Sequence, residues 1–233
     1  MGKARANFSI RNWALDWLKA HPHAEPHHDL RYALTLEALE GLPHENVLDI
    51  GGESIFTTLM RERWPNSRID ATGDIDVRTN GFDSVPMRDL VVFTEVIEHL
   101  HDLHTYHQDY DTRARWTGSG QVACLQHVVG AMLKDACLFI TTPNAAGLRV
   151  LWNVLHGLPP ITYEPHVREL TMAQLYALVL KTGLQIADSG TWTCWHHHNV
   201  SNEDIDILTR LISQVHGPME GRGDDLWLIA RKV

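Results

Sequence analysis

Two spacings of hydrophobic residues alternate along this chain. Short apolar runs predict buried strands, whereas apolar residues that recur three and four positions apart predict amphipathic helices. The predicted strands cover residues 46–50, 67–71, 89–94, 136–141, 184–187 and 226–230. The predicted helices cover residues 8–20, 29–39, 56–63, 122–133, 145–156, 171–182 and 204–215, with a further helix starting at Glu95. This alternation predicts an α/β fold with a doubly wound, mostly parallel sheet and helices on both of its faces.

The length of 233 residues fits a single domain with a sizeable core. We expect residues 1–45 to form N-terminal helices that pack on or cover the core, and residues 46–233 to form the main domain. Residues 101–120 are polar and end in Gly118-Ser119-Gly120. This composition predicts an excursion over the edge of the sheet, outside the core.

Charge and composition restrict the possible functions. The net charge of −9 argues against a nucleic-acid partner, because phosphate backbones are bound largely through cationic side chains. The three cysteines lack CxxC spacing, which indicates a reducing compartment. No apolar run reaches the roughly 20 residues that a membrane span needs, and no signal-like run follows the basic first residues. We therefore expect a cytoplasmic protein without a membrane partner.

An acidic residue and two glycines end the first predicted strand, in the segment Asp49-Ile50-Gly51-Gly52. A glycine turn between a buried strand and a helix lets a ligand approach the bare backbone N–H groups at the helix start. In an open α/β sheet the ligand crevice lies at the carboxyl ends of the strands. The segment therefore predicts a nucleotide-type cofactor site. Glycines that serve only strand–helix packing are the alternative.

A second apolar strand, residues 89–94, runs into Glu95-Val96-Ile97-Glu98-His99-Leu100. Helical spacing places Glu98 and His99 three and four positions after Glu95, so three ionisable groups share one helix face. Such groups directly after a buried strand are costly unless they are used or paired. The segment therefore predicts an active site. Glu98 as a helix cap and His99 as a hydrogen-bonded core residue are the alternatives.

Together, these two segments resemble class I S-adenosylmethionine-dependent methyltransferases of the small-molecule type, in which Glu-Val-Ile-Glu-His-Leu follows the fourth strand. The resemblance runs from about residue 28 to the end of the chain. It implies a Rossmann-like sheet whose last strand we expect to be antiparallel, and S-adenosylmethionine as the cofactor. It also implies methyl transfer to a small-molecule acceptor such as a sugar or another metabolite.

The resemblance also assigns the cofactor contacts. The implied cofactor-binding residues are Asp49, Gly51, Gly52, Glu53, Thr94 and Glu95. Asp49 would orient the amino-acid end of the cofactor, although Glu53 stands where the family commonly has a small residue. A further acid about 20 positions downstream would hold the ribose hydroxyls. Asp70 and Asp74 are both candidates, because the family has one more helix and strand in this region.

A second match with the family follows the strand at residues 136–141. Thr142-Pro143-Asn144 and a Gly/Pro segment precede His166, Arg168 and Thr171, and Thr171 is typical of a helix N-cap. The resemblance places His166 above the sheet, facing His99. An unperturbed histidine titrates near pH 6.5, so we expect His99 or His166 to take the acceptor proton, with Glu95 or Glu98 orienting the imidazole.

Two other functions stay open at this point. Small-RNA 2′-O-methyltransferases carry a similar segment, and by that resemblance Glu95, Glu98, His99 and His166 would bind Mg²⁺ or Mn²⁺. The acidic net charge weighs against RNA, so the leading interpretation includes no metal. A non-catalytic protein that keeps the cofactor fold and binds a partner is the third reading, supported by the irregular turn at Glu53.

Overall fold

The computed structural model of the chain describes residues 8–73, 76–79, 82, 86–103, 116–194, 200–215 and 217–233. Its six strands form one sheet in the order β2-β1-β3-β4-β6-β5. The strands are β1 (Asn46–Ile50), β2 (Arg68–Ala71), β3 (Arg88–Thr94), β4 (Met132–Pro143), β5 (Gln185–Trp192) and β6 (Asp225–Arg231). Strands β1 to β4 pair in parallel, and β6 pairs antiparallel with both β4 and β5. The predicted fold class and the antiparallel last strand are thus confirmed.

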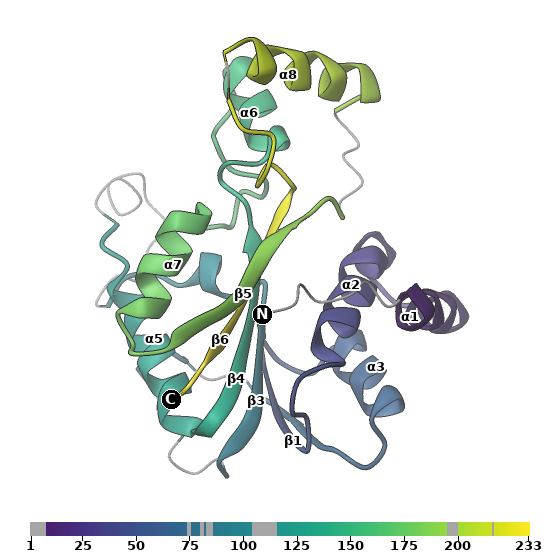
Figure 1. Ribbon diagram of the computed structural model, residues 1–233, viewed down its shortest axis with the longest axis vertical. Coiled ribbons are helices and arrows are strands. Elements are labelled where there is room, and N and C mark those ends of the chain that lie inside the picture. Colours follow the sequence, from purple (N-terminus) through teal and green to yellow (C-terminus); the bar gives the residue numbers. More distant parts are fainter. Residues whose placement is uncertain are drawn as a thin grey trace.

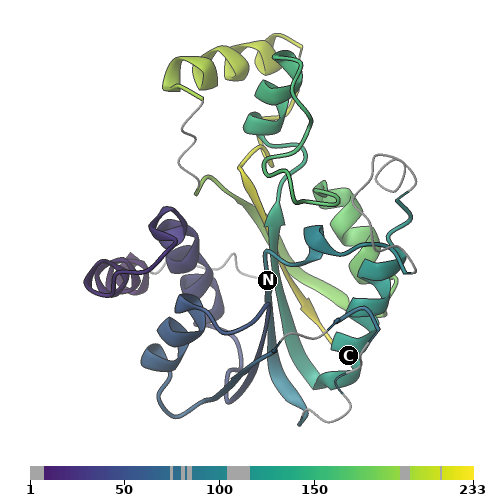
Figure 2. The ribbon, with the colours of Figure 1, turned by 180° about the vertical axis from the view of Figure 1, so that it is seen from behind.

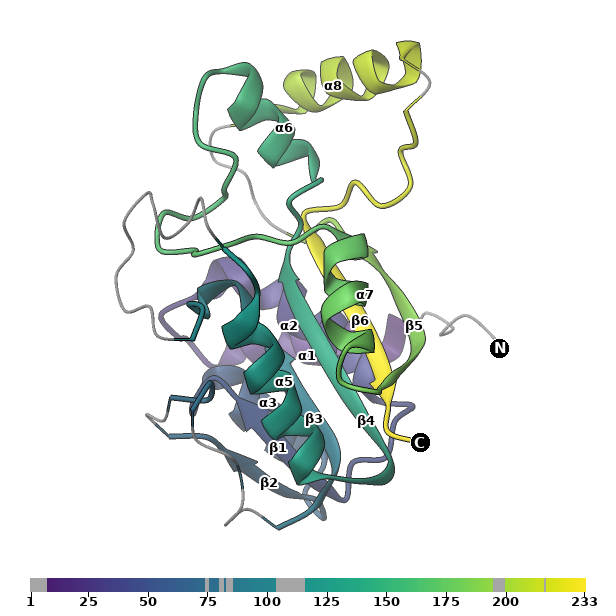
Figure 3. The same cartoon turned by 90° about the vertical axis from the view of Figure 1, so that its left-hand side faces the viewer.

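Helices cover both faces of this sheet (Figure 3). The α-helices are α1 (Phe8–Ala20), α2 (Asp29–Leu39), α3 (Ile55–Arg63), α5 (Ser119–Ala131), α6 (Leu148–Leu155), α7 (Met172–Leu180) and α8 (Asn202–Gln214). The 3-10 helices are η1 (Pro26–His28) and η2 (Ile97–His99). Capping boxes at Ser54, Thr171 and Ser201 fix the starts of α3, α7 and α8, because each hydroxyl accepts a backbone N–H of the first turn.

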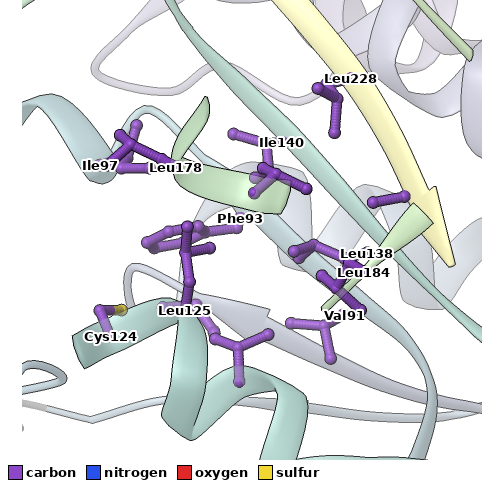
Figure 4. Close-up of a cluster of buried hydrophobic side chains, with 14 of the residues drawn as sticks. Val91, Phe93, Ile97, Cys124, Leu125, Leu138, Ile140, Leu178, Leu184 and Leu228 are labelled. Carbon is purple, nitrogen blue, oxygen red and sulfur yellow. The ribbon is translucent and has the colours of Figure 1, made fainter. Parts of the chain in front are cut away.

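Alternate side chains of the central strands pack into two separate hydrophobic cores, one on each face of the sheet. In β3, Val91 and Phe93 join the core beneath α5 and α7, whereas Leu90 and Val92 join the core beneath α1, α2 and α3. Figure 4 shows the first of these cores, with Phe93, Leu125 and Leu178 among its side chains. Side chains alternate between the faces of a strand, so both faces of a doubly wound sheet must be apolar. The continuous apolar runs in the sequence reflect this burial.

The N-terminal helices complete the second core. Ile10, Ala14 and Leu18 of α1 are buried, and so are Leu36 and Leu39 of α2. Helices α6 and α8 instead lie next to each other beyond the end of the sheet at which β4 finishes (Figures 1 and 2). None of the helices in the described part of the chain combines the length and the apolar character that crossing a bilayer requires.

The structure differs from the sequence-based prediction after β3. The predicted helix starting at Glu95 is wrong, because Glu95 has a φ of 54° and residues 96–103 contain only the short 3-10 turn η2. The Glu95 N–H donates to the carbonyl of Thr141, so this residue still follows the neighbouring strand β4. Residues within a right-handed α-helix have negative φ values, so Glu95 is not part of a helix. Glu95, Glu98 and His99 therefore do not share a helix face.

Candidate active site

A cavity of about 750 Å³ opens at the carboxyl ends of β1 and β3. Its volume lies within the range of roughly 300–1,000 Å³ that is usual for small-molecule sites. The lining residues are Glu25, His27, His28, Arg31, Tyr32, residues 49–54, Phe56, Thr94, Glu95, Val96, Glu98, His99, Arg149, Thr162, Tyr163 and His166. Most of the predicted site residues thus share one cavity, at the place where an open α/β sheet binds its ligands.

The glycine turn after β1 brings bare backbone to the cavity wall. Gly51 and Gly52 have φ values of 132° and 98°, which side-chain-bearing residues rarely adopt. A Cβ on Gly51 would also lie 3.0 Å from Cγ2 of Val96. The Gly51 N–H donates to the hydroxyl of Thr72 at 3.1 Å, which holds the turn in place. This turn therefore requires glycine for both its conformation and its packing.

Asp49 lies at the end of β1, where it is buried but still lines the cavity. Its carboxylate accepts a hydrogen bond of 2.6 Å from the hydroxyl of Thr57 in the first turns of α3. Burial raises the pKa of Asp49 to about 6, although the Thr57 hydrogen bond opposes the shift. A carboxylate that has lost much of its hydration favours a cationic ligand group. Asp49 is thus suited to the ammonium group of an amino-acid-type ligand.

The other predicted cofactor acids differ in position. Glu53 lines the rim of the cavity but forms an ion pair with Arg61 of α3. Asp70 is not among the residues that line the cavity. Its carboxylate forms ion pairs with Arg88 at 2.5 Å and with Arg68 at 2.9 Å. Asp74, the alternative to Asp70, lies outside the described residues. The geometry thus gives no support to Asp70 as the ribose ligand.

Thr94, the last residue of β3, and Glu95, which follows it, line the same cavity. Glu95 accepts a hydrogen bond of 2.8 Å from the hydroxyl of Thr141 and forms an ion pair of 3.2 Å with Arg31 of α2. Arg31 is itself buried. This ion pair connects the N-terminal helices to the end of the central strand. Arg31 was not predicted from the sequence, since an arginine in an amphipathic helix carries no signal of its own.

Glu98, His99 and His166 meet on the wall of the cavity. The Oε1 atom of Glu98 lies 3.8 Å from Nε2 of His99 and 3.9 Å from Nε2 of His166. Glu98 is fully buried, and burial raises its pKa well above the ordinary range. Its Oε2 atom accepts a hydrogen bond of 2.9 Å from Thr142, whereas Oε1 has no hydrogen-bond partner among the described residues. A buried, unpartnered oxygen on a cavity wall is a ready acceptor for a ligand proton.

These three side chains can also hold a metal ion, because their ligand atoms lie within 4.8 Å of one another. Mixed imidazole and carboxylate ligands suit a divalent ion such as Mn²⁺. Glu95, the fourth ligand of the metal alternative, is not part of this group because Arg31 and Thr141 engage its carboxylate. The structure therefore assembles three of the four residues of that set.

Glu169 is a site residue that sequence reasoning missed. It is buried beside His166, and its Oε1 atom lies 2.7 Å from Nδ1 of that ring. The same oxygen accepts hydrogen bonds from the backbone N–H and the hydroxyl of Thr162. The sequence signal was the spacing of three residues between His166 and Glu169, but such a spacing in a loop predicts no contact by itself.

The N-terminal segment also forms part of the cavity wall. The hydroxyl of Tyr32 donates to Glu25 at 2.8 Å, and its ring stacks on Phe56 with centroids 5.5 Å apart. Burial, followed by the charge of Arg31, lowers the pKa of His28 to about 3. His28 is therefore a neutral hydrogen-bonding group at physiological pH. This wall gives the cavity polar contacts that the segment after β1 does not provide.

Comparison with known proteins places the fold. No protein-family model and no curated protein matches this sequence. A SAM-dependent methyltransferase from Archaeoglobus fulgidus is 16% identical with a TM-score of 0.51, over 95% of this chain and 94% of that chain. The small RNA methyltransferase HEN1 is 13% identical with a TM-score of 0.55, over 91% of this chain and 26% of that chain.

A putative O-methyltransferase from Nostoc punctiforme PCC 73102 gives a similar match. It is 10% identical with a TM-score of 0.52, over 94% of this chain and 59% of that chain. At such low identities the likeness concerns the fold alone. The chain therefore has the Rossmann-like fold that these methyltransferases share, and its own residues must supply the argument for function.

Proposed function

We propose that this protein transfers a methyl group from S-adenosylmethionine to a small-molecule acceptor, without a nucleic-acid or membrane partner. The observation that supports this most is one cavity lined by two chemically different groups of residues. Asp49 and the glycine turn form the first group, and Glu98, His99 and His166 form the second. The first group suits a cofactor with an amino-acid tail, and the second suits an acceptor that must lose a proton.

The hydrogen-bonding groups of Asp49 and the glycine turn match those of the proposed cofactor. Asp49 would accept from the ammonium group, and the bare backbone of Gly51 and Gly52 would allow close approach. When bound, S-adenosylmethionine supplies a methyl group that its sulfonium already activates. The protein therefore has two tasks, which are to hold the acceptor in line with this methyl group and to receive a proton.

A second candidate function is a metal-dependent methyl transfer, which the grouping of Glu98, His99 and His166 favours. A bound divalent ion would orient the acceptor oxygen and lower its pKa. An RNA acceptor is disfavoured because the net charge is −9 and phosphate backbones require cationic contacts. The small-molecule function without a metal therefore stays the main proposal.

Calorimetric titration of the purified chain with S-adenosylmethionine and S-adenosylhomocysteine tests this proposal. We expect binding to both ligands, weakened about 10- to 100-fold by Asp49→Asn, because a charge-assisted hydrogen bond contributes about 1.5–3 kcal/mol. Asp16→Asn on the exposed side of α1 is the matched control and should leave the affinity unchanged.

The same titration separates the alternatives. Binding that requires added Mg²⁺ or Mn²⁺, and that chelation abolishes, would favour the metal-dependent function. No binding of either ligand by the wild type would contradict the proposal. It would favour a non-catalytic protein that uses the fold to bind a partner.

A further inference from the structure

We propose that Glu169 is a positioning residue that holds His166 with its proton on Nδ1, so that the bare Nε2 atom faces the acceptor and receives its proton. This inference rests on the proposed function, since it assigns the proton acceptor of that reaction. It replaces the sequence-based expectation that Glu95 or Glu98 orients the imidazole. Glu95 is engaged by Arg31, and Glu98 lies on the Nε2 side of the ring.

Hydrogen-bond chemistry fixes the direction of the contact between Glu169 and His166. A backbone N–H can only donate, and the N–H of Thr162 lies 2.5 Å from Oε1 of Glu169. The Thr162 hydroxyl lies 2.6 Å from the same oxygen. This oxygen is therefore an acceptor, and Nδ1 of His166, at 2.7 Å, must be the donor. In a neutral imidazole the other nitrogen, Nε2, then carries a free lone pair.

Backbone hydrogen bonds hold this arrangement against η2. The N–H groups of Val167 and Arg168 both donate to the carbonyl of Glu98, at 2.9 and 3.1 Å. The loop that carries His166 is thereby attached to the residue that its Nε2 atom faces. His166 and Glu169 are both 3% exposed, so water competes little for their hydrogen bond. The ring is thus fixed in position as well as in tautomer.

His166 is better suited than His99 to hold a transferred proton. A positive charge on His166 would lie beside the carboxylate of Glu169, which contacts Nδ1 at 2.7 Å. His99 lies 3.8 Å from Oε1 of Glu98, the same oxygen that faces His166, but its other contact is with the backbone of Pro165, whereas His166 has the Glu169 carboxylate there. Its side chain is also 40% exposed, against 4% for His166. A hydrogen bond to a carboxylate orients the ring and stabilises positive charge on it, so the geometry favours His166 as the proton acceptor.

With His166 as the proton acceptor, every bond and proton in the methyl transfer is accounted for. The acceptor oxygen or nitrogen forms a bond to the methyl carbon, and its proton moves to Nε2 of His166. The bond between the methyl carbon and sulfur breaks, and its electron pair stays on sulfur as a neutral thioether. His166 becomes an imidazolium whose Nδ1 proton remains on the hydrogen bond to Glu169. Later loss of the Nε2 proton to water restores the neutral ring.

Nitrogen NMR of the full-length chain, labelled with ¹⁵N-histidine and free of ligands and metals, tests the arrangement directly. His166→Gln assigns the signals. In the wild type near pH 8 we expect His166 with a proton on Nδ1 and none on Nε2. In Glu169→Gln the amide oxygen still accepts, so the tautomer stays, but the Nδ1 proton signal moves upfield because the hydrogen bond is no longer charge-assisted.

Glu169→Leu removes the acceptor, and the tautomers of His166 should then mix. Glu164→Gln and Glu164→Leu in the same loop, at an exposed position, are the matched controls and should leave the His166 signals unchanged. A wild-type His166 that carries its proton on Nε2 would overturn the inference. So would Glu169→Gln with an unshifted Nδ1 signal, or folded Glu169→Leu with an unchanged tautomer.

The NMR measurement needs neither cofactor nor acceptor. Failure of the Glu169 contact therefore appears in the histidine spectra, whereas failure of the proposed methyl transfer appears in the calorimetric titration. Thermal unfolding of each variant identifies a purely structural role. A variant with a lower melting temperature but wild-type His166 signals would show that Glu169 supports the fold and does not set the tautomer.

Discussion

The ion pair between Asp70 and Arg88 gives Asp70 a structural role at the edge of β2. Arg88 is 1% exposed, and its Nε and Nη1 atoms have no hydrogen-bond partner among the described residues. Partial burial opposes ionisation of Asp70, but the hydrogen bond and charge of Arg88, with those of Arg68, outweigh it and lower the pKa of Asp70. The carboxylate thus compensates a buried guanidinium, which needs a charged partner.

We therefore predict that Asp70→Asn lowers the free energy of unfolding at pH 7 by about 1–2 kcal/mol. This is less than the loss of a fully buried pair, because the side chain of Asp70 is 39% exposed. The lowered pKa means that this stabilisation is present above pH 4 and is lost as the pH falls through the folded-state pKa. Urea denaturation at several pH values measures it, with Asp16→Asn as the control. A tenfold weaker affinity for S-adenosylmethionine in Asp70→Asn would instead restore the ribose role.

Gly51 offers a residue-scale test of the turn after β1. Gly51→Ala combines a positive φ with a Cβ that would lie 3.0 Å from Val96, so we expect it to lower the free energy of unfolding by about 1–3 kcal/mol. It should also weaken cofactor binding, because the turn shifts.

Gly130→Ala is the matched control for this substitution. Gly130 lies within α5, and a Cβ there has nothing within 4 Å. We expect it to stabilise the chain by about 0.5–1 kcal/mol and to leave the affinity unchanged. If the two substitutions change the free energy of unfolding equally in urea denaturation, the turn after β1 does not require glycine.

At the scale of elements, the sequence predicts best where burial is continuous. Strands β1 and β3 were located correctly because Val47–Ile50 and Leu90–Phe93 are buried on both faces. Helix α7 was located by its predicted N-cap, Thr171, which also forms a capping box with Gln174. Strand β5 runs to Trp192, beyond the predicted residues 184–187, since its half-buried polar residues give no apolar run. For these elements the type follows from the local pattern, whereas the length of β5 does not.

The candidate site was predictable only in part for the same reason. Asp49, Gly51 and Gly52 occur in one local segment, so their shared position after β1 could be read from the sequence. The contact between His166 and Glu169 depends on the path of a loop that crosses back to the carbonyl of Glu98. The helix expected from Glu95 failed because the chain must turn sharply after a parallel strand, and helical spacing carries no information on such a turn.

At the scale of the whole molecule, buried acids make stability depend on pH. Asp49, Glu98 and Asp225 are buried, and burial raises the pKa of each. In the unfolded chain these groups ionise near pH 4, whereas the folded protein keeps their protons to higher pH. At these three groups the folded state then binds more protons than the unfolded state, so their contribution to the free energy of unfolding falls as the pH rises. For Asp49, with a pKa of about 6, the fall lies between about pH 4 and 6 and amounts to about 3 kcal/mol.

Asp225 provides the decisive variant for this effect. It is fully buried at the start of β6, and its Oδ1 atom has no hydrogen-bond partner among the described residues. Burial, the charge of Glu98 and other nearby acids raise its pKa, while the charge of Arg31 opposes the shift. Asp225→Asn cannot ionise, so we expect it to be more stable than the wild type at pH 8. The difference in the free energy of unfolding between the two proteins should become smaller towards pH 4.5, where the wild-type Asp225 carboxyl is also neutral.

Urea denaturation of both proteins between pH 4.5 and 8 measures the difference, with Asp16→Asn on the surface as the control. Below pH 4 the opposite contribution begins, because Asp70, Asp76 and Asp102 have lowered pKa values and lose their hydrogen-bonded charge there. Above pH 4.5 the lowered pKa values of His28 and His99 add an opposite contribution that both proteins share, so only the difference between the two stability curves reports the Asp225 carboxyl. Parallel stability curves for the wild type and Asp225→Asn would mean that Asp225 is ionised in the folded protein, and that Arg31 outweighs its loss of hydration.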